Sequence, residues 1–336
     1  MKYMVGYQLQ PSGALMRAIE QNRTHIHEVY FSWGNMPSGR GLASAHSALL
    51  PHQALEKQQK ELCRLSQSGL SLNLLLNANC WGSSSLSRSF LMETGDLISW
   101  MQDTFRLSSV TSASPVLSHF IKRNFPDLEV RASVNMEIGT IEGMEYLEED
   151  FDGFYAKREL NRDIAQMARM KKWCDAHGKK LYMLANSGCL NFCSARTFHD
   201  NLVAHEQEIA RMDNGVTFHS ACSRYLEKEE NRASLLAHMN CVRPEEMGLF
   251  EPYVTAAKLA TRVSPRPEAI LNAYVKGCYS GNLLDLTEPS HSAHFPFVDN
   301  SLLPADFCAH TAACSRQCAK CSYCINALKG ASVSFD

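Results

Sequence analysis

Short apolar runs alternate with longer amphipathic stretches along most of the chain. Short runs bounded by polar or turn residues are typical of buried strands, whereas apolar residues spaced three and four apart are typical of helices. The runs predict eight strands, at residues 3–8, 26–32, 72–78, 107–112, 128–135, 151–155, 180–186 and 254–259. Helical patterns lie between them at 13–21, 51–66, 91–105 and 115–122, and in a segment that ends near Gly178.

Eight strand–helix repeats match the size and rhythm of a (β/α)8 barrel, an α/β fold of about 250 residues. An open doubly wound sheet is the alternative. The barrel is favoured because residues suited to chemistry follow the predicted strands, and barrel enzymes carry their active sites in the loops after the strands. These residues are Cys80 after the third strand, Asn161 and Arg162 after the sixth, Cys189 after the seventh, and Lys258 and Arg262 at or after the eighth.

The composition of the chain is that of a globular protein, with 336 residues of which 45% are hydrophobic and 20% are charged. The net charge of −2 provides no general attraction to nucleic acid. The first ten residues lack the apolar core of a signal peptide, and no run of about 18 apolar residues occurs. We therefore expect a cytoplasmic protein without a membrane span. In that reducing compartment, the thirteen cysteines indicate metal ligation where they cluster, rather than disulfides.

A long segment follows the seventh predicted strand, at about residues 187–250, and begins with two cysteines four positions apart. Two more cysteines stand alone further along the segment. Long insertions in compact domains are usually functional, and thiolates suit zinc or an iron–sulfur cluster. The wide spacing of the last two cysteines favours a cluster that joins distant segments. The predicted ligands of this cofactor site are Cys189, Cys193, Cys222 and Cys241, with Cys80 as the alternative to Cys241.

A second group of cysteines closes the chain in the pattern C-x3-C-x2-C-x2-C. Thiols this dense are a strong metal signal, so we expect residues 291–336 to form a metal-binding segment after a barrel at 1–290. An iron–sulfur cluster or a zinc ion would satisfy these ligands. The first three also have the spacing found in radical enzymes that use S-adenosylmethionine, but at the far end of the chain. The four cysteines are Cys314, Cys318, Cys321 and Cys324, whereas Cys63, Cys174 and Cys278 stand alone and are expected to be ordinary core or surface residues.

Five motifs carry a resemblance to a known family. They are RELNRD from Arg158, NSGCLNFCSARTFHDN from Asn186, CVRPEE from Cys241, AKLATR from Ala257 and YSGNLLDL from Tyr279. Over about residues 3–286 the chain resembles the collagenase-like peptidases of family U32. The resemblance implies a barrel with a cysteine-ligated 4Fe–4S cluster that takes part in oxygen-independent hydroxylation of RNA pyrimidines or of ubiquinone precursors. Cys189, Cys193 and Cys222 are the cysteines of this chain that the resemblance matches to cysteines of the family.

The predicted function is that of an anaerobic iron–sulfur oxidoreductase or hydroxylase that acts on RNA or a small organic substrate and receives electrons from a donor protein. One 4Fe–4S cluster is expected in the 187–250 segment and a second in the C-terminal site, unless zinc fills the latter. Arginine side chains near the first site would clamp an anionic substrate, and a histidine would serve as acid or base. The residues expected around the substrate are Asn161, Arg162, Arg196 and His199. Two of these residues also have a purely structural interpretation: Arg162 could form an ion pair with Asp163 at the start of a helix, and His199 could be an ordinary loop histidine.

Three other functions stay open. The family resemblance suggests a peptidase, but a zinc peptidase needs the motif HExxH, and His205-Glu206 lacks the second histidine. A cysteine peptidase needs a cysteine beside a histidine, and the thirteen cysteines and thirteen histidines leave this open. A radical-type enzyme is the alternative suggested by the C-terminal spacing. The last is an interaction protein in which both cysteine groups bind structural zinc.

Overall fold

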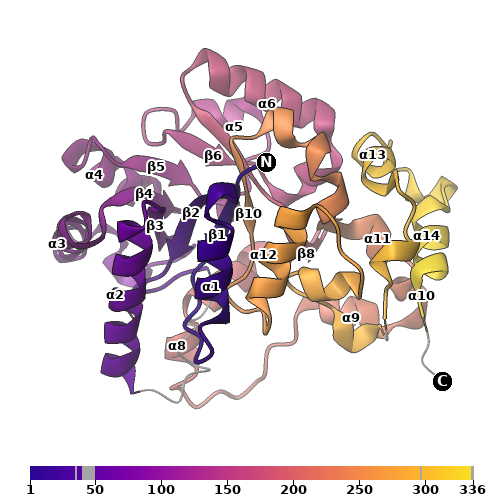
Figure 1. Ribbon diagram of the computed structural model, residues 1–336, viewed down its shortest axis with the longest axis horizontal. Coiled ribbons are helices and arrows are strands. Elements are labelled where there is room, and N and C mark those ends of the chain that lie inside the picture. Colours follow the sequence, from indigo (N-terminus) through magenta and orange to yellow (C-terminus); the bar gives the residue numbers. More distant parts are fainter. Residues whose placement is uncertain (35, 40–49, 296, 334–336) are drawn as a thin grey trace.

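A closed barrel of eight parallel strands forms the centre of the molecule (Figure 1). The computed structural model describes residues 1–34, 36–39, 50–295 and 297–333. Around the barrel the order is β1-β10-β7-β6-β5-β4-β3-β2, and pairing of β2 with β1 closes it. The strands are β1 (Tyr3–Gly6), β2 (Ile26–Phe31), β3 (Ser71–Leu76), β4 (Leu107–Ser112), β5 (Glu129–Ala132), β6 (Gly153–Tyr155), β7 (Lys180–Leu184) and β10 (Ala256–Leu259). The prediction of a (β/α)8 barrel is confirmed, and the doubly wound sheet is wrong.

Each predicted strand overlaps one strand of the barrel, but several predicted runs continue past the end of the hydrogen-bonded ladder. The first run extends to residue 8, whereas β1 ends at Gly6. Tyr7 and Gln8 beyond it remain buried, with exposed fractions of 4% and 8%. Buried residues therefore continue beyond the hydrogen-bonded part of the strand, because the loop that follows it is also packed against the protein.

Helices alternate with the strands and cover the outside of the barrel (Figure 1). Their starts follow ordinary capping signals: the Ser87, Ser114 and Asp163 side chains accept hydrogen bonds from backbone N–H groups in the first turns of their helices. Asp163 is thus a helix cap. The helices are α1 (Ala14–Gln21), α2 (Pro51–Gln67), α3 (Arg88–Phe105), α4 (Pro115–Asn124), α5 (Ile141–Glu145), α6 (Ile164–Ala176) and α12 (Pro267–Lys276).

The interior of the barrel combines apolar and charged side chains. Arg131 pairs with Glu28 at 2.6 Å, and both side chains are almost completely buried. Arg131 also donates from Nε to Glu129 at 2.7 Å. The apolar side chains that fill the interior are Met4, Tyr30, Leu75, Val134, Tyr155, Tyr182, Leu184 and Ala256.

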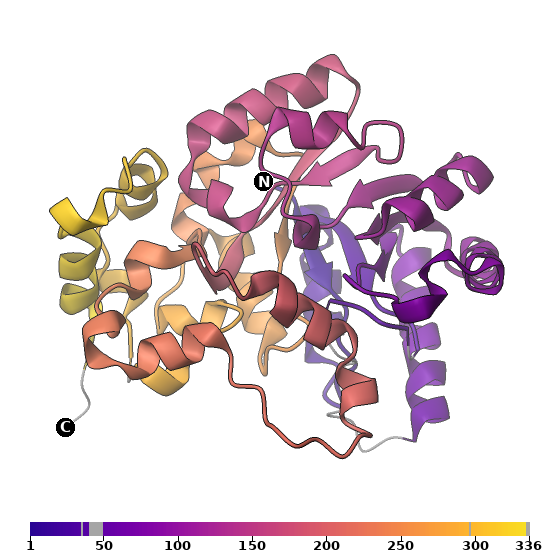
Figure 2. The same ribbon diagram turned by 180° about the vertical axis from the view of Figure 1, so that it is seen from behind.

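The segment between β7 and β10 forms a small subdomain beside the barrel. Its two strands, β8 (Asn186–Leu190) and β9 (Met239–Cys241), pair antiparallel at its base. Between them the chain makes a long excursion past the barrel and returns (Figure 2). The excursion contains α7 (Arg196–Ala204), α8 (Glu206–Ile209), α9 (Ala221–Glu227), α10 (Glu229–Arg232) and α11 (Leu235–His238), and the 3₁₀ helices η6 (Pro244–Leu249) and η7 (Glu251–Tyr253) follow β9.

The C-terminal cysteines lie in a segment that packs against the subdomain at one side of the barrel (Figures 1 and 2). The segment contains α13 (Phe307–Ala312), the 3₁₀ helix η11 (Cys318–Lys320) and α14 (Tyr323–Ala331). Within the described ranges no helix is long and apolar enough to cross a membrane.

Candidate metal centre

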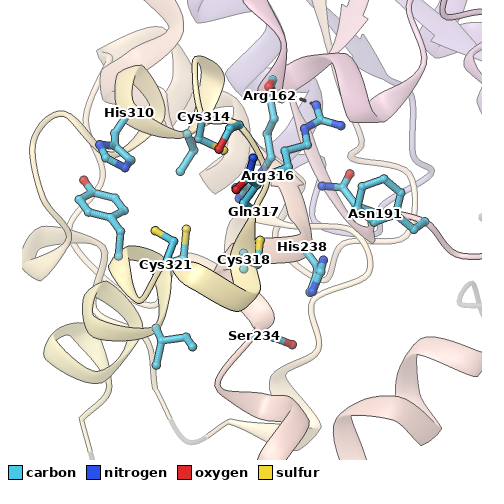
Figure 3. Close-up of a pocket in the computed structure, with 17 residues that line it drawn as sticks. Arg162, Asn191, Ser234, His238, His310, Cys314, Arg316, Gln317, Cys318 and Cys321 are labelled. Atoms are coloured by element: carbon cyan, nitrogen blue, oxygen red, sulfur yellow. Dashed lines mark hydrogen bonds between the residues drawn. The ribbon is translucent and has the colours of Figure 1, made fainter.

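All four C-terminal cysteines line one cavity of about 220 Å³. The cavity lies between the C-terminal segment and the subdomain, so its walls come from distant parts of the sequence. Figure 3 shows Cys314 and Cys321 on one side, with Arg162, Asn191 and His238 on the other. The lining residues include Cys314, Cys318, Cys321, Cys324, Arg162, Asn191, Phe192, His238, His310 and Tyr323.

Two local features hold the cysteine-bearing turns in place. Arg316 adopts a left-handed backbone with φ 58° and donates from its guanidinium to the carbonyl oxygens of Glu159 and Arg162, at 2.9 and 3.1 Å. His310 stacks on the Tyr323 ring at a centroid distance of 3.7 Å. The first contact ties the turn between Cys314 and Cys318 to the barrel, and the second joins α13 to α14.

Arg162 connects the cavity to the subdomain. Its guanidinium donates to the carbonyl oxygens of Met239, at 2.7 Å, and Leu236, and it lies near the Cys324 thiol. Burial raises the pKa of Cys324, whereas the nearby arginine lowers it. A thiolate at Cys324 would therefore have a cation beside it.

The donor set of this cavity fits an iron–sulfur cluster. Four cysteine thiolates are the usual ligands of 4Fe–4S clusters and of structural zinc. A cavity needs about 10–15 Å³ in this measure to hold one water, so 220 Å³ accommodates a group of many atoms. In the described part of the chain no three His, Cys, Asp or Glu side chains are arranged around a single ion. A cubane cluster does not require such convergence, because each thiolate binds a different iron.

Three of the four cysteines predicted for the first cofactor site are near enough to influence one another electrostatically, but among the described residues no three side chains form a group that could hold a metal ion. The pKa of Cys222 is raised by its burial and further by the neighbouring Cys189 and Cys193. Cys241 lies elsewhere: it pairs with Asn186 across β8 and β9, and its sulfur is 3.8 Å from the Tyr274 hydroxyl. Burial raises the pKa of Cys241 to about 12, which keeps this thiol protonated.

The two cysteine groups meet at one turn. Asn191 and Phe192 line the C-terminal cavity, and they lie between Cys189 and Cys193 in the sequence. Phe192 has a left-handed backbone, with φ 61°. The turn after β8 thus contributes side chains to the C-terminal cavity, and it separates Cys189 at the end of β8 from Cys193.

The four residues expected around a substrate are each engaged in other contacts. Asn161 donates to the carbonyl oxygens of Leu184 and Asn240, both at 2.7 Å. Arg162 donates to two carbonyl groups of the subdomain and lies near Cys324, as described above. His199 packs on the Phe218 ring at a centroid distance of 5.4 Å. Asn161 and Arg162 therefore anchor the subdomain to the barrel.

Arg196 links the turn after β8 to two carboxylates. Its guanidinium donates to Glu137 at 2.8 Å, to Glu159 at 2.7 Å and to the Leu190 carbonyl oxygen at 2.9 Å. Burial opposes its charge, but the two carboxylates outweigh burial and raise the pKa of Arg196 above its usual value. This arginine is a positioning residue for the end of β8, which carries Cys189, and for the turn that leads to Cys193.

Cys80, the alternative fourth ligand, contacts a histidine. Its thiol lies near the His205 side chain and accepts the backbone N–H of Gly82 at 3.4 Å. His205 donates from Nδ1 to Glu208 at 2.9 Å. These contacts lower the pKa of Cys80, chiefly through His205, and raise the pKa of His205, chiefly through Cys80. The arrangement is that of a thiol beside an imidazole that is oriented by a carboxylate, and each neighbour favours the charged form of the other.

Sequence analysis missed this group because its members come from distant segments. Cys80 follows β3, whereas His205 and Glu208 lie at the junction of α7 and α8. The only signal was a cysteine after a strand and a histidine next to glutamate. Among the cysteines expected to be isolated, Cys174 is buried, Cys63 is half-buried and Cys278 is exposed.

Comparisons with known proteins show barrels at low similarity. No protein-family model matches the chain, and no curated protein matches it in sequence. The structure of the U32 peptidase Mk0906 is similar at 14% identity and TM-score 0.49, over 64% of this chain and 80% of that one. A glycerophosphodiester phosphodiesterase from Parabacteroides distasonis is similar at 12% identity and TM-score 0.35, over 62% and 95%. A GH113 β-1,4-mannanase is similar at 10% identity and TM-score 0.38, over 76% and 86%. These values are too low to transfer a function, and membership of family U32 stays a prediction.

Proposed function

We propose that this protein is an iron–sulfur oxidoreductase built on a (β/α)8 barrel, in which Cys314, Cys318, Cys321 and Cys324 hold a 4Fe–4S cluster. The observation that carries the proposal is that these four thiols line one cavity beside Arg162. A cluster there would supply one-electron chemistry. Zinc is the alternative occupant, and it would make this site structural.

Cys189, Cys193 and Cys222 are proposed as ligands of a second cluster. This proposal is supported by the electrostatic influence of Cys189 and Cys193 on Cys222 and by the hydrogen bond from Arg196 to the Leu190 carbonyl oxygen at the end of β8, between Cys189 and Cys193 in the sequence. The fourth ligand stays open, because Cys241 contacts Tyr274 and Cys80 contacts His205. The substrate we propose is an RNA pyrimidine or a small organic molecule, hydroxylated without oxygen and with electrons from a donor protein. That assignment rests on the sequence resemblance.

Anaerobic purification tests the proposal. We expect a brown protein that contains iron and sulfide, with little zinc. Cys318→Ala should remove iron from the C-terminal site, Cys189→Ala should remove it from the subdomain, and the double variant should be colourless. Cys278→Ala is the matched control, because this exposed cysteine lies outside both groups. A colourless wild-type protein with zinc, or without metal after iron and sulfide reconstitution, would overturn the redox function.

A thiol-dependent hydrolase is the second candidate, favoured by the contact of Cys80 with His205 and Glu208. In such an enzyme the thiolate attacks a carbonyl carbon, the imidazolium protonates the leaving group, and water then hydrolyses the thioester. Hydrolysis of casein or gelatin should be lost in Cys80→Ala and retained in Cys278→Ala. Equal hydrolysis by wild type and Cys80→Ala, or none by either, would exclude this candidate.

A further inference from the structure

An asparagine amide without a hydrogen-bond partner forms part of the wall of the C-terminal cavity. Asn191 lines this cavity on the side opposite Cys314 and Cys321 (Figure 3). Its exposed fraction is only 8%. The Oδ1 atom is buried without a partner, and among the described residues nothing bonds to its Nδ2 either. Because nearly all buried polar side chains are hydrogen-bonded, this amide indicates an occupant of the cavity that can bond to it.

The backbone on both sides of Asn191 fixes the position of this amide. The Asn191 N–H donates to the His238 carbonyl oxygen at 2.8 Å, and Arg196 donates to the carbonyl oxygen of Leu190 at 2.9 Å. The next residue, Phe192, has a left-handed backbone with φ 61°, which is costly for a residue other than glycine. Such strain persists only where the surrounding structure imposes it, and it is concentrated at functional sites. The amide is therefore held at the cavity by backbone contacts, without any bond of its own.

A second unpartnered atom lies on the same wall. His238 also lines the cavity, and its buried Nδ1 has no hydrogen-bond partner. Apolar groups of Phe192, Ala237 and Ile325 line the cavity as well. Hydrogen bonds are stronger in such surroundings than in water, because the local dielectric constant is low. The wall that faces the cysteines thus suits an occupant with hydrogen-bonding atoms.

The cluster proposed for this cavity is an acceptor of hydrogen bonds. Four thiolates outweigh the charge of a 4Fe–4S core, so the cluster is anionic and becomes more so when it gains an electron. An asparagine amide has two N–H donors, and that of Asn191 breaks no other bond when it turns them towards sulfur. Hydrogen bonds to cluster sulfurs stabilise the reduced form most, and they therefore raise the reduction potential.

We propose that Asn191 donates an N–H···S hydrogen bond to the C-terminal cluster and raises its reduction potential. The inference rests on the proposed 4Fe–4S cluster of the four C-terminal cysteines. Asn191 is not a ligand of iron, so it acts as a positioning residue for charge on the cluster. Its role differs from that of Arg162, whose guanidinium also holds two carbonyl groups of the subdomain. No group of the described protein depends on the Asn191 amide, so its loss should affect only the cluster.

Redox titration tests this inference in a protein that retains one cluster. Full-length Asn191→Leu, Asn191→Gln and their parent are prepared anaerobically in the Cys189→Ala background, and EPR spectroscopy follows the C-terminal cluster. At a fixed potential, Asn191→Leu should lower the ratio of reduced to oxidised cluster by about threefold to tenfold, the size expected for one hydrogen bond. Tenfold corresponds to about 59 mV for a one-electron couple. Asn191→Gln retains the amide and should restore part of this loss.

Asn326→Leu is the matched control for the titration. Asn326 is exposed on α14 of the same segment and does not line the cavity, so the potential should stay at the parent value. A parent that holds zinc, or that lacks iron and sulfide, would overturn both the proposed function and this inference. A parent with a cluster whose potential is unchanged in Asn191→Leu would overturn this inference alone.

The stability of the metal-free protein separates this role from a structural one. Asn191→Leu replaces an unpartnered buried amide with an apolar group of similar size, so it removes a polar group that the fold leaves unsatisfied. The urea midpoint of the metal-free variant should therefore equal or exceed that of the metal-free parent, while the potential of the loaded variant falls. A midpoint that falls together with the potential would assign the shift to lost structure and would contradict the proposed hydrogen bond.

Discussion

Arg162 lies near the Cys324 thiol and lowers its pKa, while its guanidinium donates to two backbone carbonyl groups of the subdomain. One side chain therefore links the C-terminal cysteines to α11 and β9 of the subdomain. A thiolate at Cys324 is stabilised by this cation, and the turn at Asn191 and Phe192 lies across the same cavity. A substitution of Arg162 should therefore change both the stability of the fold and the metal content of the cofactor site.

Arg162→Met should lower both stability and metal content. The Met239 and Leu236 carbonyl groups would lose their donors, at a cost of roughly 2–4 kcal/mol in the free energy of unfolding. The Cys324 thiolate would lose its cation, so iron retention should fall. Urea denaturation and iron analysis measure the two effects, with the exposed Arg123→Met as control. Iron content equal to that of wild type would show that Arg162 has only a structural role.

The barrel could be predicted from the sequence because each strand is a separate local pattern, and the eight predicted runs all fall on barrel strands. The inward-facing charges could not be predicted in the same way. Glu28 and Arg131 stand in apolar runs far apart in the chain, and only closure of the barrel brings them to 2.6 Å. Pairing of this kind depends on register across several strands, which no local pattern contains.

Arg131→Met should destabilise the barrel strongly. It leaves the Glu28 carboxylate buried without its cation, and breaking one side of a buried ion pair costs roughly 3–5 kcal/mol. The double variant Glu28→Gln/Arg131→Met removes both charges and should recover part of that loss. Urea midpoints of the three proteins measure the coupling. Strictly additive losses would mean that the two side chains do not interact.

Lys258→Met should stabilise the protein, by an amount that depends on pH. The folded-state pKa of Lys258 is about 7, below the ordinary value of 10.5, so the unfolded chain binds more protons between these pH values. The charged lysine therefore destabilises the wild type fully below pH 7, and this penalty disappears as pH rises towards 10.5. We expect a gain of a few kcal/mol at pH 6 that shrinks by pH 10, measured by thermal unfolding at both pH values. A gain independent of pH would assign the effect to packing.

Cys80 should be the thiol most reactive towards iodoacetamide at slightly acidic pH. His205 lowers the pKa of Cys80, so this residue holds more thiolate than an ordinary cysteine. His205→Gln should slow its alkylation several-fold, and Glu208→Gln should have a smaller effect. Peptide mass spectrometry provides the rates, with the exposed Cys278 as internal reference. If Cys80 and Cys278 react at equal rates, the thiolate–imidazolium pair does not form in solution.

The candidate site was predictable only where its residues are close in sequence. The C-terminal thiols lie close together in the sequence, and their spacing grouped four side chains that line one cavity, while a metal there stays a prediction. Cys222 is distant from Cys189, but a shared insertion made their grouping a reasonable expectation. The contact of Cys80 with His205 could not be predicted, because it depends on where α7 ends in the folded molecule. Asn161 looked like a substrate ligand because it follows a strand, yet its amide holds two backbone carbonyl groups.

Gly188→Ala should disturb the first cysteine group while leaving the C-terminal one in place. A Cβ atom at Gly188 would lie 1.9 Å from the Pro289 carbonyl oxygen, so β8 or its neighbour must move. The hydrogen bond from the Gly188 N–H to the Glu288 carbonyl oxygen, 2.9 Å in the structure, would be strained, at a cost of roughly 1–3 kcal/mol. Because Cys189 is the next residue, iron bound by the subdomain should fall. Gly248→Ala is the matched control, since nothing lies within 4 Å of its added Cβ. Both variants are compared in a Cys318→Ala background by urea denaturation and iron analysis, and equal values would contradict this dependence of Cys189 on the contact of β8 with Pro289.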